Sequence, residues 1–268
     1  MIINIYLKYT IYEKIGVDMI EKVFICFAAE DRYEVVEPIV YHLKNYGISV
    51  WYDRYTLLMG DNRIKKNLYD GAQSCKYAII IVSPNTQLSK CAMEEISIVK
   101  ENNKEHKVTV FPILYNISPD KLTSELMWIK ELIFKECNKH SGTYEICNHI
   151  ACKITEDILS NYEYTSIISI ITHLNNKIPS YTYNILHDYC EIDTNNLNSR
   201  VTILYCAYIT IKDNIINTNS SLFILVSKIF TRLFNETKLN LPIDYRELWL
   251  LENSICILIN MHYSLDTI

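Results

Sequence analysis

The chain has 268 residues and a formal net charge of −5. Because no basic run interrupts this acidic balance, the sequence excludes a surface for a nucleic-acid backbone. No apolar run reaches the roughly 18 residues of a membrane helix, so we expect no membrane partner and a cytoplasmic location. The nine cysteines follow no disulfide framework, which favours free thiols in a reducing compartment.

The glycines divide the chain into two parts. All five lie between Gly16 and Gly142, and residues 143–268 contain none. Because the tight turns of a sheet protein use glycine, the second part is predicted to be helical. Residues 1–18 lack the charged region and cleavage site of a signal peptide, and Met19 is the natural start that we expect. We predict an N-terminal extension over residues 1–20, an α/β domain over 21–161 and a helical C-terminal domain over 162–268.

Strands and helices alternate from residue 21 onward. Short apolar runs predict four buried strands: "KVFICFA", "ISVWYD", "YAIIIVS" and "KVTVFPILYN". Helical spacing predicts helices over residues 31–46, ending at Gly47, over 62–74 and from residue 87 onward. This alternation predicts a flavodoxin-like parallel sheet with helices on both faces, followed by an all-α bundle.

The stretch "QLSKCAMEEISIV", residues 87–99, places two adjacent glutamates on a predicted helix. Helical projection puts Glu95 at the border of an apolar stripe, whereas Glu94 lies on the polar side. The stripe consists of Leu88, Ala92, Ile96 and Val99. Because burying a carboxylate costs free energy unless it is paired, Glu95 is a candidate functional group. The alternative is a side chain that reaches out to solvent.

Ligands of a parallel sheet bind at the carboxyl ends of its strands. The segments "AAED", "DRYTLLMGD" and "SPNTQLSK" fall at that edge, and Glu95 lies near it, early in the helix that follows the third strand. The first strand lacks the glycine-rich turn of a dinucleotide-binding Rossmann domain. Ser83 stands where a phosphoacceptor receiver domain keeps an aspartate.

Cysteines and histidines cluster after the fourth strand. They are Cys137, His140, Cys147, His149 and Cys152. Their spacing is irregular for a zinc site, and positions 147 and 152 point to different sides of a predicted helix. We expect no metal.

Four of these motifs together resemble the TIR domain of bacterial immune proteins, plant receptors and animal adaptors. They are "VFICFAAEDR", "YGISVWYDRYTLLMGD", "YAIIIVSPN" and "LSKCAMEEI". Enzymatic members of that family cleave NAD⁺ between nicotinamide and ribose, and carry W-x-x-x-E on the helix after the third strand. An ungapped alignment puts the family's catalytic glutamate at Glu95 and its tryptophan at Cys91. The resemblance implies NAD⁺ as substrate, with no cofactor, and a missing aromatic wall at Cys91.

The resemblance also implies the other positions of the site. The substrate-binding positions are Phe27, Ala28, Ala29, Asp53, Ser83 and Cys91. The BB loop, which governs self-association in the family, corresponds to Leu57, Leu58, Met59, Gly60 and Asp61. The alternatives are that Trp51 belongs to the core, that Gly60 serves turn geometry, and that Leu58 packs under the sheet.

By this resemblance the chain is an NAD⁺ glycohydrolase or cyclase in prokaryotic, anti-phage immune signalling, activated by self-assembly. Capture of the ribose cation by water gives ADP-ribose, and capture within the same molecule gives a cyclic isomer; the sequence leaves both open. Two other functions remain as alternatives. One is a non-catalytic TIR scaffold that acts through TIR–TIR contacts, and the other is an enzyme like a nucleoside deoxyribosyltransferase.

Five helical segments are predicted in the tail, over residues 162–176, 180–190, 197–217, 219–236 and 243–264. Asn195 or Asn196 and Asp244 are the expected N-caps. In bacterial TIR proteins the partner domain senses or oligomerises. By that analogy the tail is a regulatory or oligomerisation domain that responds to another protein or a small signal.

Overall fold

The computed structural model describes residues 23–62, 64–174, 176–212 and 221–263. The predicted extension over residues 1–20 and the expected start at Met19 lie outside the described residues. Contacts divide the chain into two compact units between Ala151 and Cys152, inside helix α6 (Tyr144–Leu159). The domain boundary at residue 161 stays a prediction. Each unit is described by itself.

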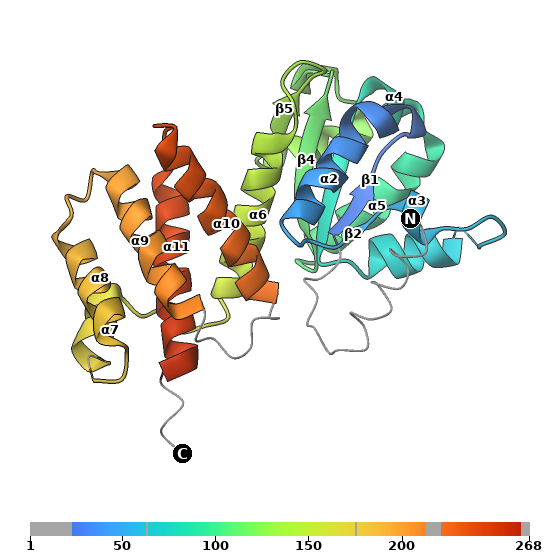
Figure 1. Cartoon of the computed structure of the whole chain (residues 1–268). Coiled ribbons are helices and arrows are strands. Elements are labelled where there is room, and N and C mark those ends of the chain that lie inside the picture. Colours follow the sequence, from blue (N-terminus) through green and yellow to red (C-terminus); the bar gives the residue numbers. More distant parts are fainter. Residues whose placement is uncertain (1–22, 63, 175, 213–220, 264–268) are drawn as a thin grey trace. The chain divides into compact units, whose positions relative to one another are not determined.

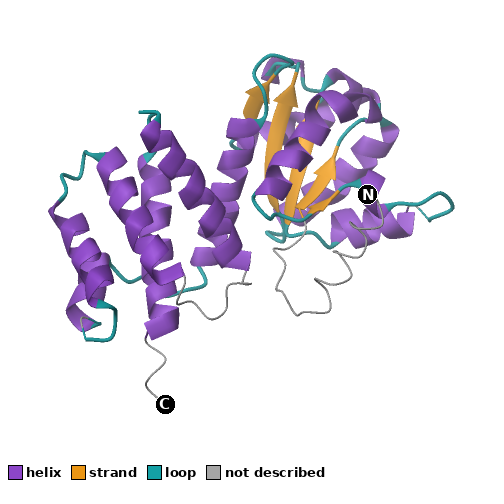
Figure 2. Ribbon diagram, viewed as in Figure 1, coloured by secondary structure: helices purple, strands orange, loops and turns teal. Residues whose placement is uncertain are grey.

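The first unit contains a five-stranded parallel sheet in the order β2-β1-β3-β4-β5. The strands are β1 (Val23–Cys26), β2 (Val50–Trp51), β3 (Tyr77–Val82), β4 (Thr109–Tyr115) and β5 (Lys135–Cys137). This order is that of flavodoxin-like folds, and Figure 2 shows helices on both faces of the sheet. The predicted fold class is confirmed. The sequence did not predict β5, because its three residues form no apolar run.

Alternate side chains of the strands build the core on each face of the sheet. On one face, Phe24 and Cys26 of β1 and Ile80 of β3 join Ile96 and Val99 of helix α5 (Lys90–Lys104) in one apolar cluster. On the other face, α2 (Glu37–Asn45) lies in front of the strands in Figure 1. Helices thus cover both faces of the sheet, and the loops that follow the strands lie at its carboxyl edge.

The first predicted helix, over residues 31–46, consists of three successive segments. They are η1 (Ala29–Asp31), the π-helical η2 (Arg32–Val36) and α2. Gly47 follows the helix with φ of 79°, the left-handed conformation that glycine adopts freely. The remaining helical segments of this unit are α3 (Asp53–Thr56), the π-helical η3 (Ile64–Gln73), α4 (Pro84–Leu88), η4 (Pro119–Lys121) and η5 (Ser124–Glu131).

The predicted apolar stripe of the glutamate-bearing helix is wrong at its first position. Ser89 accepts a hydrogen bond from the backbone N–H of Ala92 at 3.3 Å and caps α5, so this helix begins at Lys90. Leu88 ends the separate helix α4 and is 87% exposed. Ala92, Ile96 and Val99 are buried as predicted.

The second unit is a helical bundle, which confirms the predicted all-α tail. Its helices are α7 (Ile167–His173), α8 (Ser180–Glu191), α9 (Leu197–Lys212), α10 (Ser221–Lys238) and α11 (Tyr245–Tyr263). Helix α9 packs against α8, α10 and α11. The rings of Tyr208 and Phe230 stack at 4.8 Å between α9 and α10. Asn196 and Asp244 accept backbone hydrogen bonds where α9 and α11 begin, as expected of N-caps. None of the helices among the described residues is long and apolar enough to cross a membrane.

Candidate active site

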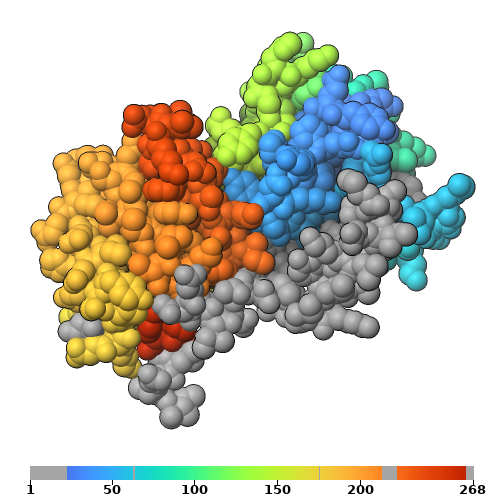
Figure 3. Space-filling model, viewed as in Figure 1, coloured from blue at the N-terminus to red at the C-terminus, as the bar shows by residue number. Residues whose placement is uncertain are grey.

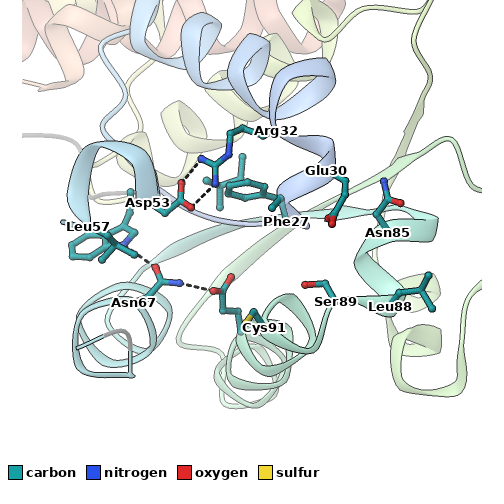
Figure 4. A pocket seen from close by; sticks show the side chains of 14 residues that line it. Phe27, Glu30, Arg32, Asp53, Leu57, Asn67, Asn85, Leu88, Ser89 and Cys91 are labelled. Atoms are coloured by element: carbon teal, nitrogen blue, oxygen red, sulfur yellow. Dashed lines mark hydrogen bonds and ion pairs between the residues drawn. The ribbon is translucent and has the colours of Figure 1, made fainter. Parts of the chain in front are cut away.

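A cavity of about 420 Å³ opens at the carboxyl edge of the sheet (Figure 4). Segments that follow β1, β2 and β3 form its walls, as expected for a ligand site of a parallel sheet. Its lining residues are Ile25, Phe27, Ala29, Glu30, Arg32, Trp51, Asp53, Leu57, Asn67, Asn85, Leu88, Ser89, Cys91 and Glu95. The volume lies within the range of pockets that hold small molecules.

The two adjacent glutamates of α5 have different surroundings. Glu95 is only 7% exposed and lines the cavity, whereas Glu94 is exposed on the surface of the helix. The predicted difference in burial is confirmed. Cys26 of β1 lies near Glu95: burial raises the pKa of its thiol well above the ordinary value, and the charge of Glu95 raises it further.

Asn67 of η3 contacts the carboxylate of Glu95. Its Nδ2 donates a hydrogen bond to Oε1 of Glu95 at 2.5 Å, and its Oδ1 accepts one from Nε1 of Trp51 at 3.4 Å. Both dashed lines meet at Asn67 in Figure 4. Sequence reasoning missed Asn67, because nothing in the local pattern places a helical asparagine against a glutamate 28 positions later.

Arg32 and Asp53 form a second polar pair in the cavity wall. The Arg32 guanidinium donates to both carboxylate oxygens of Asp53, at 2.7 and 2.8 Å, and to the hydroxyl of Tyr52 at 3.1 Å. Its carbon lies 5.1 Å from the centre of the Phe27 ring, within cation–π distance. The hydrogen bond to Asp53 raises the pKa of Arg32, which stays charged at any working pH. Sequence reasoning chose Asp53 for substrate contact and missed the arginine that holds it.

The predicted substrate-binding positions separate into two groups. Phe27, Ala29, Asp53 and Cys91 line the cavity together with Glu95. Ala28 and Ser83 are completely buried and are not among the lining residues, so their place at the substrate stays a prediction. The Ser83 hydroxyl donates to the buried Asp31 at 2.5 Å and accepts from the N–H of Thr86 at 3.0 Å. Because the bond to Asp31 joins the segments that follow β1 and β3, Ser83 links two walls of the cavity without lining it.

The predicted BB loop is largely exposed. Leu57 is half-buried and lines the cavity, but Leu58 is 68% exposed and Met59 is fully exposed. Leu58 therefore does not pack under the sheet. The Asp61 carboxylate accepts from the N–H of Leu58 and from Lys66, both at 2.8 Å. Gly60 has φ of 95°, so its turn role is observed. The loop stands out from its unit in Figure 3.

The cysteines and histidines after β4 are dispersed. Cys137 and Cys147 are buried, and burial raises the pKa of these thiols to about 11 and about 12. His140 and His149 are exposed. Among the described residues, no group of three or more histidine, cysteine or acidic side chains is placed to hold a metal ion.

A family model described as TIR domain matches residues 23–140 of the chain. These residues form a TIR domain. A solved TIR domain of the Toll-related receptor TRR-2 from Hydra magnipapillata is 20% identical, with a TM-score of 0.36, and the match covers 42% of this chain and 82% of that one.

Three curated relatives share sequence with the chain over stretches of 100–129 residues. NAD(+) hydrolase TcpA of a Theionarchaea archaeon is 28% identical over 38% of this chain and 31% of its own length. 2' cyclic ADP-D-ribose synthase BtTIR of Bacteroides thetaiotaomicron is 34% identical over 37% and 34%. NAD(+) hydrolase TcpC of Escherichia coli is 27% identical over 48% and 41%. The chain thus spans well under half the length of each of these relatives.

Proposed function

We propose that the chain is a TIR-type NAD⁺ glycohydrolase or cyclase that breaks the bond between nicotinamide and ribose. The observation that carries the proposal is the Glu95 carboxylate, nearly buried and hydrogen-bonded by Asn67 in the cavity of the TIR domain. The names of the three relatives, two hydrolases of NAD⁺ and one synthase of a cyclic ADP-ribose, support the same chemistry.

The reaction needs a carboxylate at the ribose. When the bond between C1′ and the nicotinamide nitrogen breaks, its electron pair leaves with nicotinamide, which departs neutral, and the ribose becomes an oxocarbenium cation. Glu95 stabilises this cation and hydrogen-bonds the sugar hydroxyls. Water that adds to C1′ and loses a proton gives ADP-ribose. A nucleophile of the same molecule gives a cyclic isomer in its place.

The charges in the cavity wall suit a dinucleotide with a cationic ring. Glu30, Asp53 and Glu95 are acidic, and Arg32 is the basic residue among the lining side chains. Acidic side chains attract the positively charged nicotinamide ring of NAD⁺. Arg32 offers a guanidinium, the group best suited to bind phosphate oxygens, to the diphosphate.

Because Cys91 stands in the position of the family's tryptophan, we propose that other aromatic rings contact the substrate. Cys91 lines the cavity one helical turn before Glu95, and a thiol cannot stack on a base. Phe27 and Trp51 also line the cavity and are the aromatic surfaces that we propose for the nicotinamide ring.

The direct test is to incubate the purified chain with NAD⁺ and to follow nicotinamide release. Glu95→Gln keeps the size of the side chain but removes its charge, so we expect its kcat to fall on the order of 10²–10³-fold. The matched control is Glu94→Gln, an exposed neighbour on the same helix, which should keep its activity. No nicotinamide release, even at high protein concentration and after forced clustering, would overturn the proposal.

A non-catalytic TIR scaffold is the second candidate. Cys91 in the tryptophan position and the exposed side chains of Leu58 and Met59 favour it. In that case the chain would bind other TIR domains and release no nicotinamide. For either candidate we propose prokaryotic immune signalling as the setting and the helical unit as a regulatory or assembly domain.

A further inference from the structure

We infer that Asn67 is a positioning residue for Glu95: its side-chain amide, oriented by Trp51, keeps the carboxylate ionised and fixed in the cavity. This inference rests on the proposed function for its purpose. The contacts that carry it concern Trp51, Asn67, Gly71 and Glu95 alone, and they can be tested without any assay of activity.

The contact is buried and joins two elements that are distant in the sequence. Asn67 lies on η3 and Glu95 on α5, and each residue is only 7% exposed. The amide nitrogen lies 2.5 Å from the carboxylate oxygen. A carboxylate accepts such a bond best in its ionised form, whereas burial alone favours the neutral acid. The amide therefore offsets the cost of keeping a charge in this nearly buried position.

Trp51 decides which end of the amide faces Glu95. An asparagine side chain can rotate so that either its oxygen or its nitrogen faces a neighbour. The indole N–H of Trp51 can only donate, and it lies 3.4 Å from the amide oxygen. Since that oxygen is directed at Trp51, the NH₂ group is directed at Glu95. If the amide were reversed, its oxygen would face the Glu95 carboxylate and its NH₂ group would face the indole N–H of Trp51. Neither contact would be a hydrogen bond.

Gly71 explains how η3 comes close enough for these contacts. A Cβ atom added at this position would lie 2.9 Å from Nε1 of Trp51 and 2.7 Å from the ring of Phe24. A larger residue would therefore push η3 away from Trp51. Asn67 lies four positions before Gly71 on the same helix, so the close approach at the glycine sets the place of the asparagine.

Other ionisable groups lie near Glu95 or line the same cavity. Cys26 lies on β1, and the charge of Glu95 contributes to the raised pKa of its thiol. Cys91 precedes Glu95 on α5, and Arg32, Asp53 and Glu30 belong to the cavity wall. Replacing Asn67 changes none of these groups. A change in the titration of Glu95 on substitution therefore reports the amide contact.

The test is a titration of the Glu95 carboxyl group in the full chain by ¹³C NMR with labelled glutamate. The resonance is assigned by its absence in Glu95→Gln. In Asn67→Leu, which has similar shape but no donor, we expect the titration midpoint to rise by about one pH unit or more. Asn67→Asp should raise it further, since it sets a second carboxyl group against the first. Trp51→Phe keeps an aromatic ring but frees the amide, and should give a smaller rise.

The matched control is Asn102→Leu. Asn102 of α5 also links this helix to η3, donating to the carbonyl oxygens of Ala72 and Gln73 at 3.3 Å, but it does not line the cavity. Its replacement should leave the midpoint of Glu95 unchanged. A midpoint that is the same in Asn67→Leu as in the wild type, or an equal rise in Asn102→Leu, would overturn the inference.

Activity supplies a separate measurement. In Asn67→Leu, kcat for NAD⁺ should fall at least about tenfold with KM little changed, and the acidic limb of the pH profile should move to higher pH. If the wild type releases no nicotinamide, the proposed function fails, while the titration still decides the role of Asn67.

Discussion

Arg32 and Asp53 meet in the cavity wall through two parallel hydrogen bonds, of 2.7 and 2.8 Å. This bidentate geometry fixes the plane of the guanidinium, and Phe27 lies 5.1 Å from its carbon. The arginine is thus held at the cavity by a carboxylate on one side and by aromatic rings on the other. We therefore expect this arginine to bind the anionic part of a ligand without having to be ordered first.

Arg32→Lys should weaken substrate binding without slowing the chemical step. A lysine keeps the charge but cannot make both bonds to Asp53, so we expect KM for NAD⁺ to rise about tenfold and kcat to stay within about twofold. Initial-rate kinetics measure both. The control is Arg54→Lys, because Arg54 pairs with Glu37 and does not line this cavity. An equal rise in KM for the control would mean that general charge, and not this contact, attracts the substrate.

The sequence predicted those features that depend on local spacing. Four strands and the position of Glu95 at the border of an apolar stripe follow from apolar periodicity within short segments, and the alternation of strands and helices predicts the parallel fold. The exposed Leu88 shows the limit of this reasoning, because the cap at Ser89 starts a new helix. A helical projection that is extended past the true start of a helix assigns the wrong face to the residues before that start.

The contacts that shape the site could not be predicted in this way. Asn67 meets Glu95 across 28 positions, and Arg32 meets Asp53 across 21. An asparagine or an arginine on a predicted helix most often faces water, and its partner is set by how the helices pack on the sheet. Ser83 is the opposite case. The sequence places it correctly at the end of β3, but its hydroxyl donates a hydrogen bond to Asp31.

Cys91→Trp should increase the affinity for NAD⁺. The side chain at this position is exposed and lines the cavity, so a tryptophan adds an aromatic face beside the substrate. Stacking contributes about 1 kcal/mol, so we expect KM to fall about fivefold. Kinetics of Cys91→Trp and of Cys91→Ala, which adds no ring, measure the effect. A KM that rises only in the tryptophan variant would mean that Phe27 and Trp51 already fill this space.

ADP-ribose should protect Cys91 from alkylation. Cys91 and Cys206 are both exposed, but only Cys91 lines the cavity. Cys147 is buried, and burial raises the pKa of its thiol to about 12, so it stays protonated and unreactive near pH 8. Peptide mapping after brief treatment with iodoacetamide should show Cys91 and Cys206 labelled and Cys147 unlabelled. Equal labelling of Cys91 with and without saturating ADP-ribose would contradict binding in this cavity.

The exposed side chains of Leu58 and Met59 should control activity through assembly. Adjacent exposed apolar residues in a loop indicate a surface that docks on another molecule. If this contact is head-to-tail and its rotation does not close, it builds open strands. A neighbouring copy could then supply the aromatic wall that Cys91 does not. We therefore expect the specific activity of the wild type to rise with protein concentration, together with its size in light scattering.

Leu58→Asp and Met59→Asp should abolish that rise, since a buried carboxylate in the contact is costly. Leu57 is unsuitable for this test because it lines the cavity, and its replacement would alter the site itself. Ile133→Asp is the matched control: Ile133 is another exposed apolar residue of the same unit, outside the loop and the cavity. If the wild type stays monomeric and its specific activity does not depend on protein concentration, assembly does not control activity. Each copy would then form a complete active site by itself. Equal loss in Ile133→Asp would assign the effect to surface charge in general and not to the loop.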